Sequence, residues 1–446
     1  MSNEGKLKFF GLRNLMDIPQ LKILSPEERF GIYVAAHVFP FRTNSYVIDE
    51  LINWNNVPDD PIFRLTFPSP EMLEIEEYND LADLISSDAD KEEIKAVVNR
   101  IRFKLNPHPA GQLIANVPVL DDERVQGVQH KYNETALIFP SNGQTCHAYC
   151  TFCFRWAQFT GMTDLKFATD EAKRYLDYIA EHKELTDVLI TGGDPMIMTS
   201  KHLEAYIEPL LSTEFDHIKN IRIGSKSLSY WPYRFLTDKD SDAILRLFEK
   251  VVKSGKHLAF MAHFNHWVEL STPAVRKAIE RLKNAGVEIR TQSPLIRNIN
   301  DSADVWQRMW QEQVNLGLIP YYMFVERDTG AHHYFAVPLA EAVEIFRDAY
   351  SNVSGLARTV RGPSMSSTPG KVNIEGISEI NGEKVFVLNF IQARNPEWLK
   401  RPFFAKYDTE ATWLDELEPA FEDEFFFEEE LAEILAQKAD EYNISK

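Results

Sequence analysis

Between about residues 130 and 325, six short β-rich runs alternate with helical segments, and this alternation most constrains the fold. Amphipathic segments separate the runs, such as residues 170–181 and a segment that begins at Thr272 and ends near Gly286. Strands that alternate with helices form parallel sheets with right-handed connections. The sequence therefore predicts an α/β fold, and six strands instead of eight indicate a partial (β/α)6 TIM-like barrel. The six runs are residues 136–140, 188–191, 221–224, 258–263, 287–291 and 319–325.

The regions on either side of these repeats have a different pattern. The first 125 residues carry helical stripes of apolar residues, and Ser25 with Glu28 forms a helix-start signature. Beyond the repeats, residues 362–371 read as a loop of small residues, and Asn381-Gly382 predicts a hairpin that leads into a strand at 384–390. We expect four segments: a helical N-terminal region, a (β/α)6 core, a lysine-bearing loop with C-terminal strands, and an acidic tail helix. Their bounds are 1–125, 126–340, 341–410 and 411–446.

The charge of the chain excludes some classes of partner. The formal net charge is −19, and residues 411–446 carry twelve acidic against two basic side chains. This balance argues against a nucleic-acid surface. We expect the tail to dock as an amphipathic helix through its phenylalanines, with a partner-binding tail as the alternative. Neither a membrane span nor an export leader is expected, and reduced cysteines fit a cytoplasmic location.

All three cysteines of the 446 residues fall within eight positions, as Cys146, Cys150 and Cys153. Thiolates are the usual ligands of iron–sulfur clusters, and three of them leave one iron of a 4Fe–4S cluster open to an external ligand. A zinc site with His147 as the fourth ligand is one alternative, and three buried, unreactive thiols are another. The odd count disfavours a disulfide framework. The spacing favours the cluster.

Polar or glycine residues follow every predicted strand. Functional groups of such folds collect at the carboxyl ends of the strands, so these residues are expected to surround one pocket. Turns favour the same residue types, but six sets in register with a cysteine triad indicate more than turns. After the cysteines, the sets are Gly192-Gly193-Asp194, Gly224-Ser225-Lys226, His263-Phe264-Asn265-His266, Gln292-Ser293 and Glu326-Arg327-Asp328.

The C-x3-C-x2-C spacing resembles that of the radical SAM enzymes, and further motifs narrow the resemblance to the lysine 2,3-aminomutase family. These motifs run from about residue 130 to 371, over half of the chain, whereas the N-terminal region and the tail match poorly. The motifs are Cys146-x3-Cys150-x2-Cys153-x-Arg155, Leu189-Ile190-Thr191-Gly192-Gly193-Asp194, Ile221-Arg222-Ile223-Gly224-Ser225, His263-Phe264-Asn265-His266, Gln292-Ser293, Pro320-Tyr321-Tyr322 and Gly370-Lys371.

The resemblance implies a chemistry and its cofactors. A barrel of the radical SAM type would bind a 4Fe–4S cluster, S-adenosyl-L-methionine and pyridoxal 5′-phosphate. The amino group of an amino acid, held as an imine on pyridoxal phosphate, would move from carbon 2 to carbon 3. The resemblance also implies an external one-electron reductant, such as flavodoxin or ferredoxin. Because the family often forms oligomers, a homo-oligomer is a further expectation.

The resemblance assigns roles residue by residue. Lys371 matches the lysine that forms the imine with the cofactor aldehyde. Arg155 matches the arginine that binds the substrate α-carboxylate. Lys131 stands where the family has a phosphate-binding arginine, and a second such arginine falls near Thr135. The positions implied to contact S-adenosylmethionine or pyridoxal phosphate are Gly192, Gly193, Asp194, Ser225, His263 and Gln292.

Two positions depart from the lysine-specific members, in which two aspartates hold the distal ammonium group. Counting from Pro320-Tyr321-Tyr322 places the first at Arg327, and counting back from Lys371 places the second at Ser364. A buried arginine repels an ammonium group and pairs with a carboxylate. We therefore predict a substrate with an acidic side chain, such as glutamate. A one-residue shift would put Asp328 at the first position and keep lysine as the alternative.

Three further alternatives remain open from the sequence. The first is a radical SAM enzyme of another reaction type that has lost pyridoxal phosphate. The second is a binding module stabilised by zinc on the cysteines and His147. The third is an iron–sulfur protein that senses or carries electrons.

Overall fold

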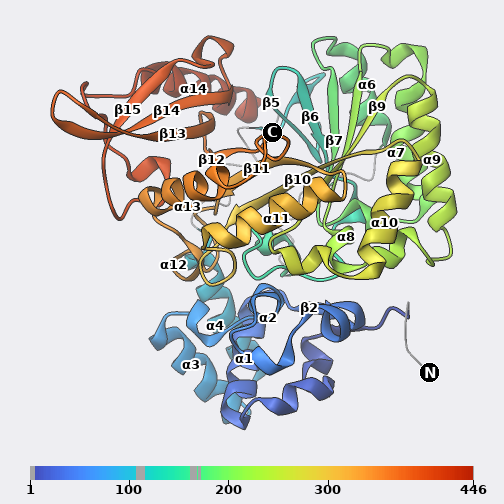
Figure 1. Ribbon diagram of the computed structural model, residues 1–446, viewed down its shortest axis with the longest axis vertical. Coiled ribbons are helices and arrows are strands. Elements are labelled where there is room, and N and C mark those ends of the chain that lie inside the picture. Colours follow the sequence, from blue (N-terminus) through green and yellow to red (C-terminus); the bar gives the residue numbers. More distant parts are fainter. Residues whose placement is uncertain (1–5, 107–115, 161–167, 169–171, 445–446) are drawn as a thin grey trace.

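A large, mostly parallel sheet organises the chain in the computed structural model, which describes residues 6–106, 116–160, 168 and 172–444 (Figure 1). Eleven strands lie side by side in reverse chain order from β15 to β5. All pairings from β6 to β12 are parallel, and those at the two ends are antiparallel. The strands are β5 (Val128–Tyr132), β6 (Thr135–Ile138), β7 (Asp187–Ile190), β8 (Asn220–Ser225), β9 (His257–His263), β10 (Glu288–Leu295), β11 (Ile319–Val325), β12 (Arg361–Ser366), β13 (Gly370–Ile380), β14 (Glu383–Ala393) and β15 (Pro402–Lys406).

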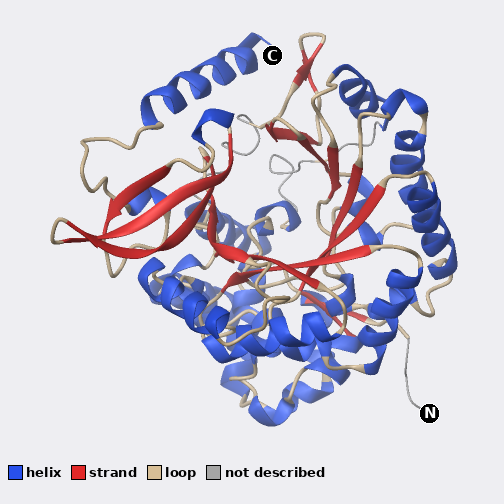
Figure 2. Ribbon diagram, turned by 45° about the horizontal axis from the view of Figure 1, so that its top comes forward, coloured by secondary structure: helices blue, strands red, loops and turns tan. Residues whose placement is uncertain are grey.

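Strands β6 to β11 are the six predicted ones, so the α/β class and the parallel pairing are confirmed. Helices flank these strands (Figure 2), and their apolar side chains share one core with the strands. The expected helix at 170–181 is present from Ala172, while its first two residues lie outside the described ones. The side chain of Thr272 accepts from the backbone N–H of Val275 and starts α10 as predicted. The helices are α6 (Ala172–Glu181), α7 (Ser200–Ile207), α8 (Ser227–Tyr230), α9 (Ser241–Lys253), α10 (Pro273–Asn284), α11 (Ala303–Asn315), α12 (His332–Phe335) and α13 (Leu339–Ser351).

The N-terminal helices gather on one side of the sheet (Figure 1). Ser25 Oγ accepts from the N–H of Glu28, while Glu28 Oε2 accepts from the N–H of Ser25, so the predicted capping box is confirmed. This region shares an apolar core with Ala148, Trp156 and Tyr230, so it packs directly on the segment that carries the cysteines. Its elements are β1 (Phe9–Gly11), α1 (Pro26–Val38), β2 (Arg42–Asn44), α2 (Pro61–Thr66), α3 (Ile75–Ser86) and α4 (Lys91–Lys104), and the short pair β3 (Val119–Leu120) and β4 (Glu123–Arg124) follows.

The prediction of a loop over residues 362–371 was wrong. These residues form most of β12, a tight turn, and the start of β13. Small residues are needed because β12 lies close to its neighbour: a Cβ on Gly362 would be 2.4 Å from the carbonyl O of Met323. Lys371 therefore stands on a strand, where its backbone is fixed by pairing with Gln392 and Ser366.

The C-terminal segment docks on the end of the sheet. Asn381 and Gly382 have φ values of 54° and 83°, which confirms the hairpin between β13 and β14. The tail forms α14 (Glu428–Ile444), as expected, and Phe425 and Phe427 are buried against β14 and β15 just before the helix begins. Within the described ranges, no helix is long and apolar enough to cross a membrane.

Candidate active site

The cysteine loop follows β6 and is anchored by the N-terminal region. The N–H of Tyr149 donates to the carbonyl O of Arg42 at 2.8 Å, and the N–H of Thr151 donates to the carbonyl O of Leu65 at 3.0 Å. Within the loop, the N–H of Cys153 donates to the carbonyl O of Cys150. The N-terminal region, which the sequence predicts only to be helical, therefore positions the cysteine loop.

Burial raises the pKa of all three thiols: well above the usual value at Cys146, to about 12 at Cys150, and upward at Cys153. The negative charges of neighbouring cysteines add to this effect at Cys146 and Cys150, so the sulfurs lie within electrostatic reach of one another. Three neighbouring, partly buried thiolates are costly without a compensating cation, whereas a bound metal deprotonates its thiols outright. The donor set thus fits a cationic metal centre.

The zinc alternative fits less well than the cluster. His147 is buried, and its charged neighbours are Arg234 and Arg42, not the thiols; burial lowers its pKa to about 3. Within the part of the chain that the structure describes, no three His, Cys, Asp or Glu side chains are placed to share one metal ion. A single zinc ion needs all its sulfurs at about 2.3 Å, whereas each iron of a cluster can take its own cysteine.

Gly192 and Gly193 let the β7 loop lie against the cysteine loop. A Cβ on Gly193 would be 2.5 Å from Thr145 N and 2.7 Å from Thr145 O, and one on Gly192 would be 2.4 Å from Gln144 Nε2. Gly192 also has a φ of 149°, which side-chain-bearing residues rarely adopt. Both glycines are therefore required by close packing beside Cys146.

Asp194 joins the ends of β7 and β8. Its Oδ1 accepts from Ser225 Oγ at 2.7 Å and from the N–H of Met196, and its Oδ2 accepts from the N–H of Lys226 at 3.0 Å. Burial raises its pKa to about 6. The structure thus brings Asp194 and Ser225 together. The predicted contact of Asp194 with the ammonium group of S-adenosylmethionine stays a prediction.

His263 and Gln292 are partners in the β9–β10 pairing, beside the same end of the sheet. Burial, together with the positive charge of Lys226, lowers the pKa of His263 to about 3. The imidazole is therefore neutral at physiological pH and offers one donor and one acceptor nitrogen. His263 is the last residue of β9, as predicted, whereas Gln292 lies inside β10, which continues to Leu295 beyond the predicted end at residue 291.

Lys371 is a half-buried lysine whose pKa falls to about 7, because of desolvation first and then the positive charges of Arg222 and Arg361. Its Nζ donates to Gln392 Oε1 at 2.9 Å and lies 4.3 Å from the centroid of the Tyr322 ring. Near pH 7, Lys371 is therefore a neutral amine in about half of the molecules, and the neutral amine is the form that attacks a carbonyl carbon. This environment suits a lysine that binds a cofactor aldehyde.

Two further cations hold the turn between β12 and β13. Lys131 Nζ donates to the carbonyl O of Ser367 at 2.5 Å, and Arg394 Nε donates to the carbonyl O of Thr368 at 2.9 Å. Burial lowers the pKa of Lys131 well below its usual value, with Arg394, Arg327 and Lys371 adding repulsion. Sequence reasoning missed Arg394; its position just after β14, the strand paired with Lys371, was the available signal.

Arg155 and Arg327 lie on the same phenylalanine. Their guanidinium carbons are 5.2 and 5.8 Å from the centroid of the Phe154 ring. Each keeps a buried nitrogen, Nη1 of Arg155 and Nε of Arg327, with no hydrogen-bond partner among the residues that the structure describes. Repulsion from Arg327 adds to burial in lowering the pKa of Arg155 to about 10.

Arg327, just after β11, reaches β12, the neighbouring strand that carries Ser364; these are the two departures from the lysine-specific pattern. Arg327 Nη1 donates to the carbonyl O of Ser366, two residues from Ser364 on β12. Arg327 Nε is also 3.6 Å from Asp328 Oδ1. Ser364 is fully buried, and its Oγ has no partner within the described part of the chain.

Known proteins resemble the chain over most of its length, although no family model matches it. A candidate L-lysine 2,3-aminomutase of Aquifex aeolicus is 32% identical over 406 residues, which are 91% of this chain and 95% of the relative. An L-lysine 2,3-aminomutase of Fusobacterium nucleatum is 31% identical over 238 residues, 53% of this chain and 52% of the relative. The L-lysine 2,3-aminomutase of Bacillus subtilis is 25% identical over 382 residues, 85% of this chain and 70% of the relative.

A C-x3-C-x2-C triad beside the carboxyl ends of parallel strands is typical of radical SAM enzymes. Because a relative is 32% identical to this chain over 91% of the chain's length, the chain belongs to the lysine 2,3-aminomutase family. The expected family is thereby confirmed, and with it the enzyme class, a radical SAM aminomutase. The family implies an iron–sulfur cluster, S-adenosylmethionine and pyridoxal phosphate, and an amino-acid substrate.

Proposed function

We propose that the protein is a radical SAM 2,3-aminomutase whose substrate is an amino acid with an acidic side chain, such as glutamate. Arg155 and Arg327 carry the proposal. These two guanidinium groups lie on the Phe154 ring, and each keeps a buried nitrogen without a hydrogen bond to any described residue, Arg327 Nε having only a 3.6 Å ion-pair contact with Asp328. Unsatisfied buried donors are costly, and charge-assisted pairing with a carboxylate satisfies them. Two such donors suit a substrate with two carboxylates.

The cofactors and this chain have separate roles. When bound, the cluster, S-adenosylmethionine and pyridoxal phosphate supply the radical and the electron delocalisation that side chains lack. Cys146, Cys150 and Cys153 would hold the cluster. Lys371, with its lowered pKa, would bind the cofactor aldehyde, and Lys131 would face the phosphate with Arg394, which compensates for the arginine that Lys131 replaces.

Arg155 would orient the α-carboxylate, and Arg327 with Ser364 would receive the side-chain carboxylate. A hydrogen bond to a charged group contributes about 1.5–3 kcal/mol, which is roughly 10- to 100-fold in affinity. The ammonium group of lysine at the same place would meet the positive charge of Arg327. Asp328 does not offset this for lysine, because its carboxylate lies 3.6 Å from Arg327 Nε.

The proposed function also includes the shape of the sheet, the residues around the cofactors and the source of the electron. The parallel strands would curl into the incomplete barrel of radical SAM enzymes, with Gly192, Gly193, Asp194, Ser225, His263 and Gln292 around S-adenosylmethionine and pyridoxal phosphate. A flavodoxin or ferredoxin in the cytoplasm would supply the electron.

Separate incubations test the substrate. Reduced, reconstituted enzyme with S-adenosylmethionine and pyridoxal phosphate is given glutamate or lysine, and β-amino acids are quantified by mass spectrometry. We expect β-glutamate, and Arg327→Gln should lower kcat/KM for glutamate roughly 10- to 100-fold. Arg276→Gln is the matched control, because Arg276 pairs with Glu312 on the surface. Formation of β-lysine without β-glutamate rejects the acidic substrate.

A further inference from the structure

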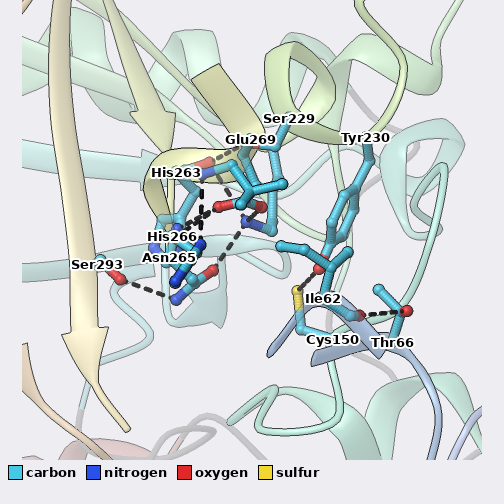
Figure 3. Close-up of polar contacts among 12 residues, drawn as sticks. Ile62, Thr66, Cys150, Ser229, Tyr230, His263, Asn265, His266, Glu269 and Ser293 are labelled. Atoms are coloured by element: carbon cyan, nitrogen blue, oxygen red, sulfur yellow. Dashed lines mark hydrogen bonds and ion pairs between the residues drawn. The ribbon is translucent and has the colours of Figure 1, made fainter. Parts of the chain in front are cut away.

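Tyr230 brings a hydroxyl group to one of the three cysteines. It is the last residue of α8, it is 1% exposed, and its Oη lies 3.3 Å from Cys150 Sγ (Figure 3). The backbone on either side fixes this position. The N–H of Tyr230 donates to the carbonyl O of Lys226, and the carbonyl O of Tyr230 accepts from Asn44 Nδ2 at 3.0 Å.

The direction of this hydrogen bond follows from the state of the thiol. In a free thiol either atom could donate, but a cysteine that binds iron is a thiolate and has no proton to give. Cys150 Sγ is the only partner that the described residues offer to the Tyr230 hydroxyl group. With the cluster bound, Tyr230 is therefore the donor and the sulfur of Cys150 is the acceptor.

The cation of a largely buried ion pair between Lys226 and Glu269 lies over the Tyr230 ring. Lys226 Nζ lies 4.5 Å from the ring centroid, and it donates to Glu269 Oε1 at 2.6 Å and to Asn265 Oδ1 at 2.8 Å. Asn265 Nδ2 in turn donates to Ser293 Oγ at 2.8 Å, so the ends of β8, β9 and β10 are linked (Figure 3). The fully buried Glu269 also accepts from the backbone N–H of Asn265. The ring that reaches Cys150 therefore lies beside this network of polar contacts.

We propose that Tyr230 is a positioning residue that tunes the reduction potential of the cluster by donating a hydrogen bond to Cys150 Sγ. Reduction adds one electron to the cluster and makes the cysteine sulfurs more negative, so the donor stabilises the reduced form more than the oxidised form. Hydrogen bonds to the sulfurs are among the factors that set such potentials. Tyr230 thus makes the cluster easier to reduce. The inference rests on the cluster of the proposed function.

The test is the midpoint potential of the cluster in Tyr230→Phe, which removes the hydroxyl group and keeps the ring. The reconstituted full-length protein is titrated anaerobically with dithionite, and the reduced cluster is followed by electron paramagnetic resonance. We expect the reduction equilibrium to become about tenfold less favourable, a shift of about 59 mV to more negative potential for a one-electron couple. The matched control is Tyr175→Phe, because Tyr175 is also 1% exposed and donates instead to the carbonyl O of Tyr206. Its midpoint should equal that of the wild type.

A second substitution tests a shift of the cluster's midpoint potential in the opposite direction. A fluorinated tyrosine at position 230 is a stronger donor of the same shape, and it should move the midpoint to less negative potential. If Tyr230→Phe fails to bind iron, the fluorinated variant still tests the role of the Tyr230 hydrogen bond. An unchanged midpoint in a variant with the iron and sulfide content of the wild type overturns the role of Tyr230 and leaves the proposed function intact. Absence of iron and sulfide from the reconstituted wild type overturns both.

Discussion

Covalent capture of pyridoxal phosphate by Lys371 should occur at a lower pH than capture by an exposed lysine. Only the neutral amine attacks an aldehyde, so capture follows the fraction of Lys371 that has lost its proton. Burial, with Arg222 and Arg361, lowers the pKa of Lys371 from 10.5 to about 7. At pH 8 such a pKa leaves about 90% of the amine neutral, against about 0.3% for an ordinary lysine. The expected advantage is roughly 300-fold.

Borohydride trapping measures this directly and needs no turnover. The protein is mixed with pyridoxal phosphate across a pH series, reduced and digested, and the adduct on Lys371 is quantified by mass spectrometry. Half-maximal capture should fall near pH 7, while exposed lysines in the same digest keep rising toward about 10.4. Arg361→Gln removes a positive neighbour and should move the Lys371 midpoint upward. A Lys371 midpoint above about pH 9 would refute the reasoning.

Two further predictions concern the cysteine loop and the stability of the fold. Gly193→Ala should lower the iron content after anaerobic reconstitution, because the new Cβ would be 2.5 Å from the backbone of the cysteine loop; Gly355→Ala, with nothing within 4 Å, should bind iron as the wild type does. Equal iron in both variants would contradict the prediction. Burial outweighs the nearby His332 and raises the pKa of Glu326 from 4.5 to about 7. Between these values the folded protein keeps a proton that the unfolded chain has lost, so the Glu326 contribution to the free energy of unfolding falls as pH rises. Glu326→Gln should flatten that fall in denaturant titrations from about pH 4.5 to 7, and an unchanged slope would disprove it.

Local patterns predicted the parts of the fold that depend on neighbouring residues. The strand at residues 319–325 was predicted with its bounds, and the capping box at Ser25 and the turn at Asn381-Gly382 were predicted from two to four residues each. The stretch at 362–371 was misread as a loop, because small residues that allow close packing of strands also favour turns.

The sequence by itself determined the chemistry of the ligands. The spacing of Cys146, Cys150 and Cys153 within eight residues indicates a cluster, since the loop that carries them is local. Only the tertiary structure decided the surroundings of these residues. The lowered pKa of Lys371, the guanidinium pair on Phe154, and the Tyr230 hydroxyl group beside Cys150 all depend on burial and on charges from distant segments. Burial and long-range contacts arise from packing, and no local pattern in the chain records them.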